Sequence, residues 1–495
     1  MKQKITLTAG LFLVLCLFGC SDFLTVDVPD SLTKKEYWKS RDHAKASLVG
    51  VYTTLGNNIP NFICWGGLRS EIYGLRSGIY PYSQFVDQDI RITNSLCDWG
   101  EVYRGINRAN SFLKNVHLVL DNDRSFTVGE MNAMMGQVYA LRALNYFYLV
   151  RTFRDVPYHT EPYESDTQSP YAAAVPEETV LDSIESDLSR ALAMVPDGFD
   201  RPNENYGYVT KNAVMALWAD VKLWRKKYEE CIDLCERIEK KYRGQTVAAD
   251  SWFSMFSIGN ARESIFEYQY LDDGPASGVG NLFYGIVTAN RSAYYYNVRK
   301  VYPPVFGGSE TTDTIRPQRT VQRVDDFDGV FKYLGIFASN GQFVQRDQTG
   351  RNKVNFIFYR YREVLLMKAE ALGALGRYEE AVEPVNEIRT ATGMVTVTPD
   401  EMGSGENFMD RIICEHRTEL AYEGKDWFIL LRIARNTGYT DLLIDRIGEH
   451  SSSSIKEQTL KAYLANPESW FLPYYDSEVQ NNLLLTQKDF YKGKK

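Results

Sequence analysis

The sequence predicts a mainly α-helical protein in which helical hairpins form a scaffold and long, loop-rich inserts carry a few short strands. Ten segments repeat apolar residues at the spacing of an amphipathic helix, and breaks of only three residues, at 225–227 and 375–377, join some of them into hairpins. Two other stretches, 57–91 and 244–355, are rich in Gly, Tyr, Phe, Asp and Asn and show few helical runs. The predicted helices are 40–55, 95–120, 128–150, 177–195, 210–224, 228–241, 358–375, 378–392, 408–423 and 427–434.

The first nineteen residues have the pattern of an export signal rather than of a fold. Lys2 and Lys4 flank the start of an apolar run over 5–18, which at about 14 residues is shorter than the roughly 20 needed to span a bilayer. The run ends in Leu-Phe-Gly-Cys, which resembles the lipobox of bacterial lipoproteins. We therefore expect residues 1–19 to be removed and Cys20 to carry the lipid, because several acyl chains on one residue anchor a protein firmly. The alternatives are a cleaved signal followed by an unmodified cysteine, and a buried leader helix.

The chain after this leader is long and acidic. About 475 residues exceed what one compact core usually holds, so we expect two or three subdomains. Loss of the two leader lysines takes the formal net charge from −8 to −10, which argues against nucleic acid as a partner and against electrostatic docking on anionic lipid. No later stretch is long and apolar enough to cross a membrane.

Two of the predicted hairpins share an internal pattern. When Ala219 is aligned with Ala369, small or apolar residues follow 12, 16 and 19 positions later in both segments, which is the tetratricopeptide pattern. Because the units lie 150 residues apart, they are not a tandem array, and long inserts separate them. The matched pairs are Tyr228 with Tyr378, Cys231 with Ala381, Cys235 with Val385 and Ile238 with Ile388.

The same alignment explains the pair Cys231 and Cys235. Both occupy packing positions of a second helix and no histidine lies nearby in sequence, so we interpret them as buried thiols rather than as a metal or redox pair. The five cysteines that follow Cys20 are odd in number and scattered, which does not fit a disulfide framework. The sequence predicts no metal site and no cofactor.

The chain offers no catalytic motif. None of its five histidines stands in HExxH, and neither a Gly-x-Ser-x-Gly nor a Walker-type loop is present. Carboxylates are abundant, but no pair stands out as the acid and base of a glycosidase. We therefore expect a protein that binds a ligand and is not an enzyme.

The two inserts have the composition of a carbohydrate site. The apolar C–H face of a sugar ring lies well on an aromatic ring, and its hydroxyls bind amide, carboxylate and guanidinium groups. The alternative is that the aromatic rings pack the loops onto the helical body; three consecutive tyrosines at 294–296 cannot all point one way, so we expect at least one to face outward. Trp99 is assigned to the packing of its helix rather than to the site. The candidate ligand contacts are Trp65, Arg69, Tyr73, Tyr80, Tyr82, Tyr294, Tyr295, Tyr296 and Asn297, and the other members of these clusters are Glu71, Arg76, Asp87, Phe283, Tyr284, Asn290 and Arg291.

Six segments, in order along nearly the whole chain, carry more specific patterns. They are Cys-Ser-Asp-Phe-Leu at 20–24, Trp-x3-Tyr-x2-Ile-x2-Ala-Asn at 99–110, Ala-Leu-Arg-Ala-Leu-x-Tyr-Phe-Tyr-Leu-Val-Arg at 140–151, Tyr-Arg-Glu-Val-Leu-Leu-Met-Lys-Ala-Glu-Ala at 361–371, Glu-His-Arg-x-Glu-Leu-Ala-Tyr-Glu-Gly at 415–424 and Trp-x-Leu-Pro at 470–473. Together they resemble the SusD/RagB outer-membrane lipoproteins of Bacteroidetes. The chain departs from that pattern around Trp427, where an arginine and an aspartate usual in the family are both absent.

The resemblance implies a function and a location. Proteins of this family sit on the cell surface as a lid over a TonB-dependent, SusC-like transporter, capture an oligosaccharide or in some members a peptide, and pass it inward. It also implies an N-terminal SusD-like helical part over 20–243 and a C-terminal RagB/SusD-like part over 244–495, which contains the insert 244–355. We expect a lipid-anchored glycan-binding protein of the outer membrane that faces the cell exterior. The alternatives are the same architecture binding a peptide or another nutrient, and a scaffold whose helical repeats hold protein partners.

Overall fold

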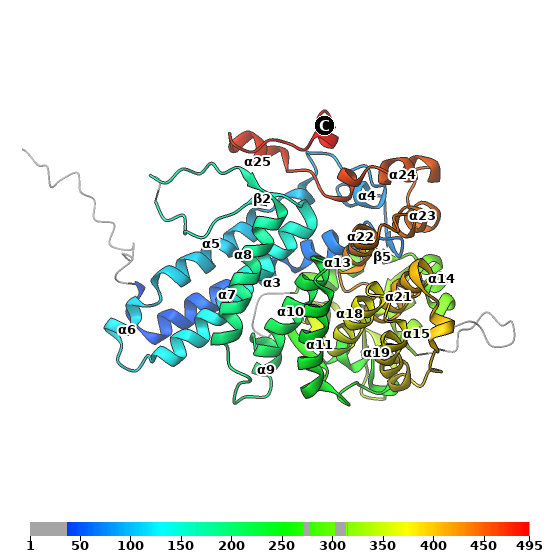
Figure 1. Cartoon of the computed structure of the whole chain (residues 1–495), viewed down its shortest axis with the longest axis horizontal. Coiled ribbons are helices and arrows are strands. Elements are labelled where there is room, and N and C mark those ends of the chain that lie inside the picture. The colour runs from blue at the N-terminus through cyan, green and yellow to red at the C-terminus, as the bar shows by residue number, and fades with distance from the viewer. Residues whose placement is uncertain (1–36, 166, 271–276, 302–312, 314, 495) are drawn as a thin grey trace, which may run out of the picture.

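A computed structural model of the chain describes residues 37–165, 167–270, 277–301, 313 and 315–494. The predicted signal 1–19 and the predicted lipid attachment at Cys20 lie outside these residues. The protein is mostly helical with a few short strands (Figure 1), which confirms the predicted fold class. In the described part of the chain, no helix combines the length and the apolar character needed to cross a bilayer.

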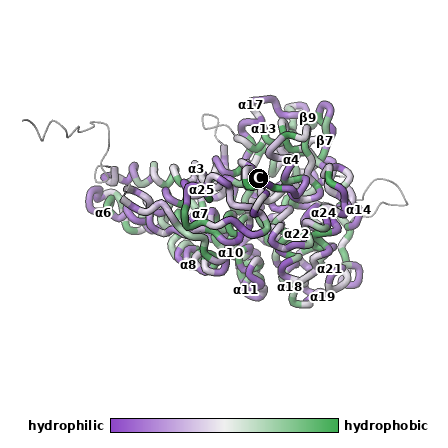
Figure 2. The backbone as a smooth tube through the Cα atoms, turned by 90° about the horizontal axis from the view of Figure 1, so that it is seen from above, coloured by the Kyte–Doolittle hydropathy of each residue, from purple (hydrophilic) through white to green (hydrophobic). Residues whose placement is uncertain are grey.

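Four long helices form an elongated lobe at one side of the molecule (Figure 1). The hydroxyl of Thr127 and the carboxylate of Glu130 cap the start of α7 reciprocally. Every residue from 140 to 153 in α7 is buried, because neighbouring helices cover it on several sides. Hydrophobic and hydrophilic residues alternate along these helices, as amphipathic packing requires (Figure 2). The four helices are α3 (Arg41–Gly67), α5 (Gly100–Asn115), α7 (Val128–Phe153) and α8 (Glu177–Met194).

The two predicted repeat units lie next to each other in space. The hairpin α10 (Lys211–Trp224) and α11 (Tyr228–Tyr242) packs on the hairpin α18 (Tyr361–Ala374) and α19 (Tyr378–Ala391), with α11 against α18. The aligned alanines of the two units are fully buried, as are the aligned cysteine, alanine and valine side chains of the second helices. Units separated by 150 residues therefore stack directly, and the second insert loops out between them.

Two predictions about the inserts are corrected. The first insert is partly helical, because α3 continues through Pro60 to Gly67 instead of ending at residue 55. Ile59, Phe62 and Ile63 keep the helical spacing and are fully buried, so their burial outweighs the backbone hydrogen bond that proline cannot donate. The second insert contains several helices, the longest of which is α14. They are η3 (Ala249–Ser251), α12 (Ser254–Ser257), α13 (Gly278–Gly285), α14 (Arg291–Val301), α15 (Arg316–Thr320), α16 (Phe331–Leu334) and α17 (Gln348–Arg351).

The strands are short and, in the described residues, pair in twos, always antiparallel. The predicted strand segments 264–270 and 354–361 are confirmed as β4 and β10, which pair with each other. The β1–β5 pair joins the first insert to the second, with Tyr73 opposite Ala289. The pairs are β1 (Tyr73–Leu75) with β5 (Val287–Ala289), β2 (Val156–Pro157) with β3 (Ala174–Val175), β4 (Ser264–Tyr268) with β10 (Phe356–Arg360), β6 (Val321–Val324) with β7 (Phe327–Val330), and β8 (Gly335–Phe337) with β9 (Phe343–Gln345).

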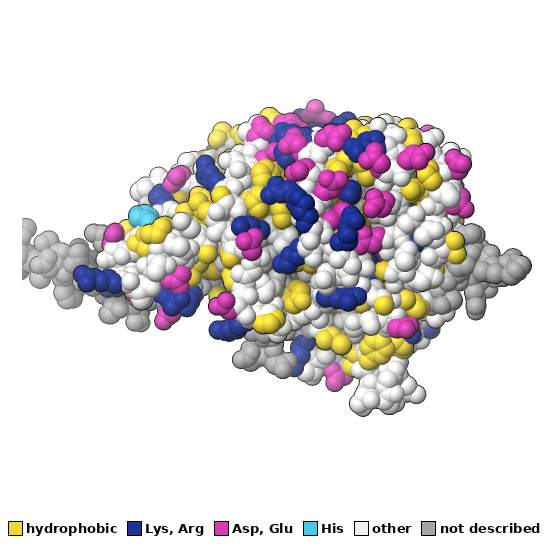
Figure 3. All heavy atoms as spheres, turned by 60° about the horizontal axis from the view of Figure 1, so that its bottom comes forward, with side chains coloured by type: hydrophobic (Ala, Val, Ile, Leu, Met, Phe, Trp, Pro, Cys, Tyr) yellow, Lys and Arg dark blue, Asp and Glu magenta, His cyan; other side chains and the backbone are white. Residues whose placement is uncertain are grey.

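The remaining elements connect this framework and close one side of it. On the surface shown in Figure 3, acidic and basic side chains are interspersed over the face seen from below. The short N-terminal elements are α4 (Tyr82–Val86), η2 (Ser95–Cys97), α6 (Leu118–Asn122) and α9 (Glu204–Gly207). The C-terminal elements are α20 (Pro399–Met402), α21 (Gly405–Leu420), α22 (Asp426–Thr437), α23 (Asp441–His450), α24 (Glu457–Leu464), η5 (Pro467–Trp470), α25 (Asp476–Asn481) and η6 (Asp489–Tyr491).

Candidate ligand site at the junction of the two inserts

The two inserts meet in a cleft, which we call the insert junction. Its volume of about 410 Å³ lies within the range of small-molecule sites. One wall comes from 74–87 in the first insert, and another comes from 288–292 and Asp328 in the second. Ser452 and Ser454, in the loop after α23, complete the lining.

Asn290 fastens these segments together. Its side-chain amide donates to the carbonyl oxygens of Glu71 at 2.9 Å and His450 at 2.7 Å. Its backbone N–H donates to the carbonyl of Ile72 at 2.7 Å, which extends the β1–β5 pairing by one bond. One residue thus ties the first insert and the loop after α23 to the start of α14, so the cleft has a fixed shape.

The exposed lining of the insert junction is polar and charged. Arg291 and Asp328 form an ion pair at 3.5 Å that remains accessible from solvent. The carboxylate of Asp87 accepts from the hydroxyl of Ser453 at 2.7 Å and from the backbone N–H of Ser454 at 2.8 Å. Guanidinium, carboxylate and hydroxyl groups side by side can bind a ligand that carries many hydroxyls.

A buried layer of charged groups supports this cleft from below. Arg417 pairs with Glu71 at 3.1 Å and with Asp426 at 2.9 Å, and the hydroxyl of Tyr73 donates to Asp426 at 3.0 Å. All four side chains are essentially inaccessible. Burial raises the pKa of Asp426 to about 6 although Arg417 opposes the shift. Burial also acts to raise the pKa of Glu71, but the nearby cations Arg417 and Arg446 together with hydrogen bonds outweigh it, so the pKa of Glu71 is lowered. This ionic network joins the first insert to α21 and α22.

Five of the predicted ligand contacts lie in buried positions and face the interior. The indole N–H of Trp65 donates to the carbonyl of Leu96 at 2.6 Å. Arg69 donates to backbone carbonyls in the C-terminal tail at 2.8 Å, and its guanidinium lies 3.9 Å from the ring centroid of Trp427. In this structure these side chains hold the inserts on the helical body and present no surface to a ligand. The five are Trp65, Arg69, Tyr73, Tyr294 and Asn297.

The other four predicted contacts reach the surface to different degrees. Tyr80 is 55% exposed, and Tyr82 and Tyr295 are half-buried. Tyr296 is 38% exposed and its ring lies 4.1 Å from that of His450, beside the loop that lines the insert junction. Successive residues of a helix point about 100° apart, so the sequence of three tyrosines on α14 gives one buried, one half-buried and one exposed ring. At least one of them faces outward, as predicted.

The sequence predicts part of the lining of the insert junction. Asp87, Asn290 and Arg291 belong to the predicted clusters and do line the cleft. Asp328, in the turn-flanked strand β7, and the serines of the loop after α23 line it as well but do not belong to those clusters. A run of four serines at 451–454 indicates a loop, but no local pattern shows that this loop returns to the inserts.

Comparisons with known proteins match both halves of the chain. Residues 72–223 match a family model described as "Starch-binding associating with outer membrane", and residues 333–491 match one described as "SusD family". SusD-like protein P38 of Formosa agariphila is 26% identical over 483 residues, which covers 85% of this chain and 90% of that protein.

Solved structures show the same fold. A SusD superfamily protein from Bacteroides thetaiotaomicron aligns with a TM-score of 0.71 at 20% identity, covering 92% of this chain and 99% of that one. A laminarin-binding SusD-like protein aligns with a TM-score of 0.67 at 19% identity, covering 91% and 99%. The two sequence matches together span more than half of the chain and leave most of the second insert between them. The chain belongs to the SusD/RagB family.

Proposed function

We propose that this protein is a cell-surface lipoprotein that binds a glycan at the insert junction and delivers it to a TonB-dependent, SusC-like transporter of the outer membrane. The observation that carries the proposal is the cleft itself: two inserts far apart in sequence converge on exposed polar groups suited to hydroxyls. Family membership and the phrase "associating with outer membrane" in the matched description support the location. In the proposal the lipid on Cys20 holds the protein to the membrane and the helical body faces the exterior.

Binding without catalysis is part of the proposal. The exposed carboxylates of the insert junction are already engaged, Asp328 by Arg291 and Asp87 by the serine loop. Within the described residues no three His, Cys, Asp or Glu side chains cluster so as to hold a metal ion. A cleft of paired charges on a rigid frame is suited to hold a ligand and release it unchanged.

The test is affinity electrophoresis of a soluble form that begins at Ser21, in gels containing amylopectin, laminarin, xylan or galactomannan. At least one neutral glycan should retard the protein, and Arg291→Ala and Asp328→Ala should each reduce the retardation because each removes half of the exposed pair. Arg237→Ala, which breaks a surface ion pair with Asp233 on α11, is the matched control and should migrate like the parent.

Two results would contradict the proposal. If no glycan retards the protein and peptides give calorimetric heat that depends on Arg291, the site belongs to a peptide-binding member. If the full-length lipidated protein captures no large outer-membrane barrel from detergent extracts, the transporter partnership is wrong.

A further inference from the structure

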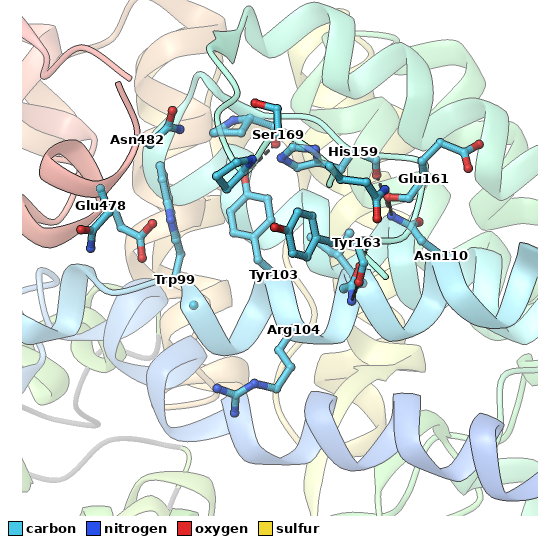
Figure 4. Close-up of a pocket in the computed structure, with 17 residues that line it drawn as sticks. Trp99, Tyr103, Arg104, Asn110, His159, Glu161, Tyr163, Ser169, Glu478 and Asn482 are labelled. Atoms are coloured by element: carbon cyan, nitrogen blue, oxygen red, sulfur yellow. Dashed lines mark hydrogen bonds between the residues drawn. The ribbon is translucent and has the colours of Figure 1, made fainter. Parts of the chain in front are cut away.

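A second cleft lies on another part of the molecule, between α5 and the segment that follows β2 (Figure 4). We call it the α5 cleft. Its volume is about 530 Å³, and it shares no lining residue with the insert junction. Helix α25, near the C-terminus, closes one end through Glu478 and Asn481.

Aromatic rings form the floor and one edge of the α5 cleft. Trp99, Tyr103 and Asn107 recur every four residues and therefore share one face of α5. Trp99 is only 3% exposed, and its ring packs edge-on against Phe153 with centroids 4.9 Å apart. The hydroxyl of Tyr103 donates to the carbonyl of Pro157 at 2.7 Å, which holds that ring in place. Trp99, Tyr103 and Tyr163 lie in a row above α5 (Figure 4).

The edge of the cleft is fixed by amide side chains. Tyr163 donates its backbone N–H to the Asn107 side-chain oxygen at 2.6 Å and accepts from the Asn107 amide nitrogen at 3.3 Å. Asn482 forms the same reciprocal pair with the backbone of Ala172, at 2.7 and 3.2 Å. The backbone of Tyr163 is thus held while the residue stays 46% exposed, as a preformed platform requires.

The charged groups around the α5 cleft are satisfied within the protein. Arg104 pairs with Glu101, and Glu161 pairs with Lys114 at 2.6 Å. Burial raises the pKa of Glu478, although a hydrogen bond from Trp99 opposes the shift. Among the described lining residues, no unpaired arginine or lysine is offered to an acidic ligand. What the cleft does offer is aromatic faces and amide groups.

We propose that the α5 cleft is a second ligand site, for an uncharged oligosaccharide. A sugar ring lies with its C–H face on Tyr163 and Tyr103, and its hydroxyls bind the amides along the edge. A primary amide has two N–H donors, and Asn107 uses one of them on Tyr163, so the other is available to a ligand. This site goes beyond the proposed function, which needs only the insert junction. Two sites on one rigid chain would hold a polysaccharide far longer than either site alone.

The experiment uses the soluble protein from Ser21 with Arg291→Ala, so that the α5 cleft is the site left intact. Calorimetry against neutral oligosaccharides cut from the glycan that retards the parent should still detect binding. Adding Tyr163→Ala should weaken that binding about tenfold, because the exposed platform is removed. Tyr163→Phe should restore it. Tyr171→Ala, a tyrosine 41% exposed in the same segment but outside the lining, should leave it unchanged.

The outcomes separate the two proposals. If the parent binds glycan and Arg291→Ala binds none, the α5 cleft is not a saccharide site and the insert junction stands. If Arg291→Ala binds as the parent does and Tyr163→Ala removes all retardation, the second site stands and the insert junction is wrong. If Tyr163 is needed only for an acidic oligosaccharide or a peptide, the ligand class assigned here is overturned. If the parent binds no glycan, both proposals fall.

Discussion

The insert junction and the α5 cleft differ in the kind of residues that line them and in the contacts that hold their shape. The insert junction is assembled from three chain segments, its lining is charged, and beneath it lies a buried network of Glu71, Arg417 and Asp426. The α5 cleft is organised on one helix, its floor is aromatic, and amide-to-backbone pairs hold its edge. Loops need long-range ties to keep a fixed shape, whereas a helix brings its own hydrogen bonds. Buried ion pairs and packed aromatic rings can thus give similar rigidity. We expect the two clefts to lose their shape under different substitutions and at different pH values.

The largest difference should follow from removing a buried charge. Arg417→Ala leaves Glu71 and Asp426 inside the protein without their cation, so we expect a loss of about 3–5 kcal/mol in the free energy of unfolding. The loss is measured by urea denaturation, with ligand binding at each cleft followed below the transition. The insert junction should lose affinity first, because its supporting layer is the one disturbed.

The control is Arg377→Ala. Arg377 pairs with Glu229 and Glu380 at the surface, where solvent already screens the charges, so its removal should change stability little. If Arg417→Ala costs no more than this control, the ionic network does not support the junction.

A smaller effect should appear in how the free energy of unfolding depends on pH, through the buried charged groups under the insert junction. Because burial raises the pKa of Asp426 to about 6, the folded state binds more protons than the unfolded state between pH 4 and pH 6. The stability that this group contributes is complete below pH 4 and is lost as the pH rises through 6. Between pH 4 and pH 6 we expect the free energy of unfolding of the parent to fall by about 2–3 kcal/mol relative to that of Asp426→Asn. Parallel curves of unfolding free energy for the two proteins would contradict this expectation.

The sequence predicts the scaffold well because its determinants are local. Hydrophobic spacing locates the helices, and the match of Ala219 with Ala369 identifies the two repeat units before any contact between them is known. Hydrophobic spacing is not sufficient to predict features that depend on packing between distant segments. Pro60 predicts a helix end although Ile59, Phe62 and Ile63 keep the helical spacing, and only their burial shows that α3 continues. Likewise, only the helix α14 shows which of the three tyrosines at 294–296 is exposed.

The sites are less predictable, since both depend on contacts between distant segments. Trp65 and Arg69 have the residue types of a sugar site, yet Leu96 and the C-terminal tail take up their polar groups. The sequence pattern places Trp99 in the packing of its helix, and the residue is buried, but it also forms part of the floor of the α5 cleft. The four-residue spacing that it shares with Tyr103 marks one helix face. Only the fold shows that Tyr163 lies opposite that face.

The smallest expected effect concerns Lys488, which lies behind the aromatic floor of the α5 cleft. The change of stability with pH that it causes has the opposite sign to the change caused by Asp426. Lys488 donates to the carbonyl of Leu472 and lies near the rings of Phe153 and Tyr474, which flank Trp99. Burial lowers the pKa of this ammonium to about 7, with Arg154 adding to the shift. Between pH 7 and pH 10 the unfolded state therefore binds more protons, and stability rises with pH.

From pH 7 to pH 9.5 we expect the free energy of unfolding of the parent to rise by about 1–2 kcal/mol relative to that of Lys488→Met. This value is smaller than the full pKa shift would give, because the side chain of Lys488 is partly accessible to solvent. Urea denaturation of both proteins across that interval measures it. Two curves that stay parallel would show that Lys488 is charged in the folded state. The α5 cleft would then lack a titrating group behind its aromatic floor, and the pH response that distinguishes the two clefts would come from Asp426 alone.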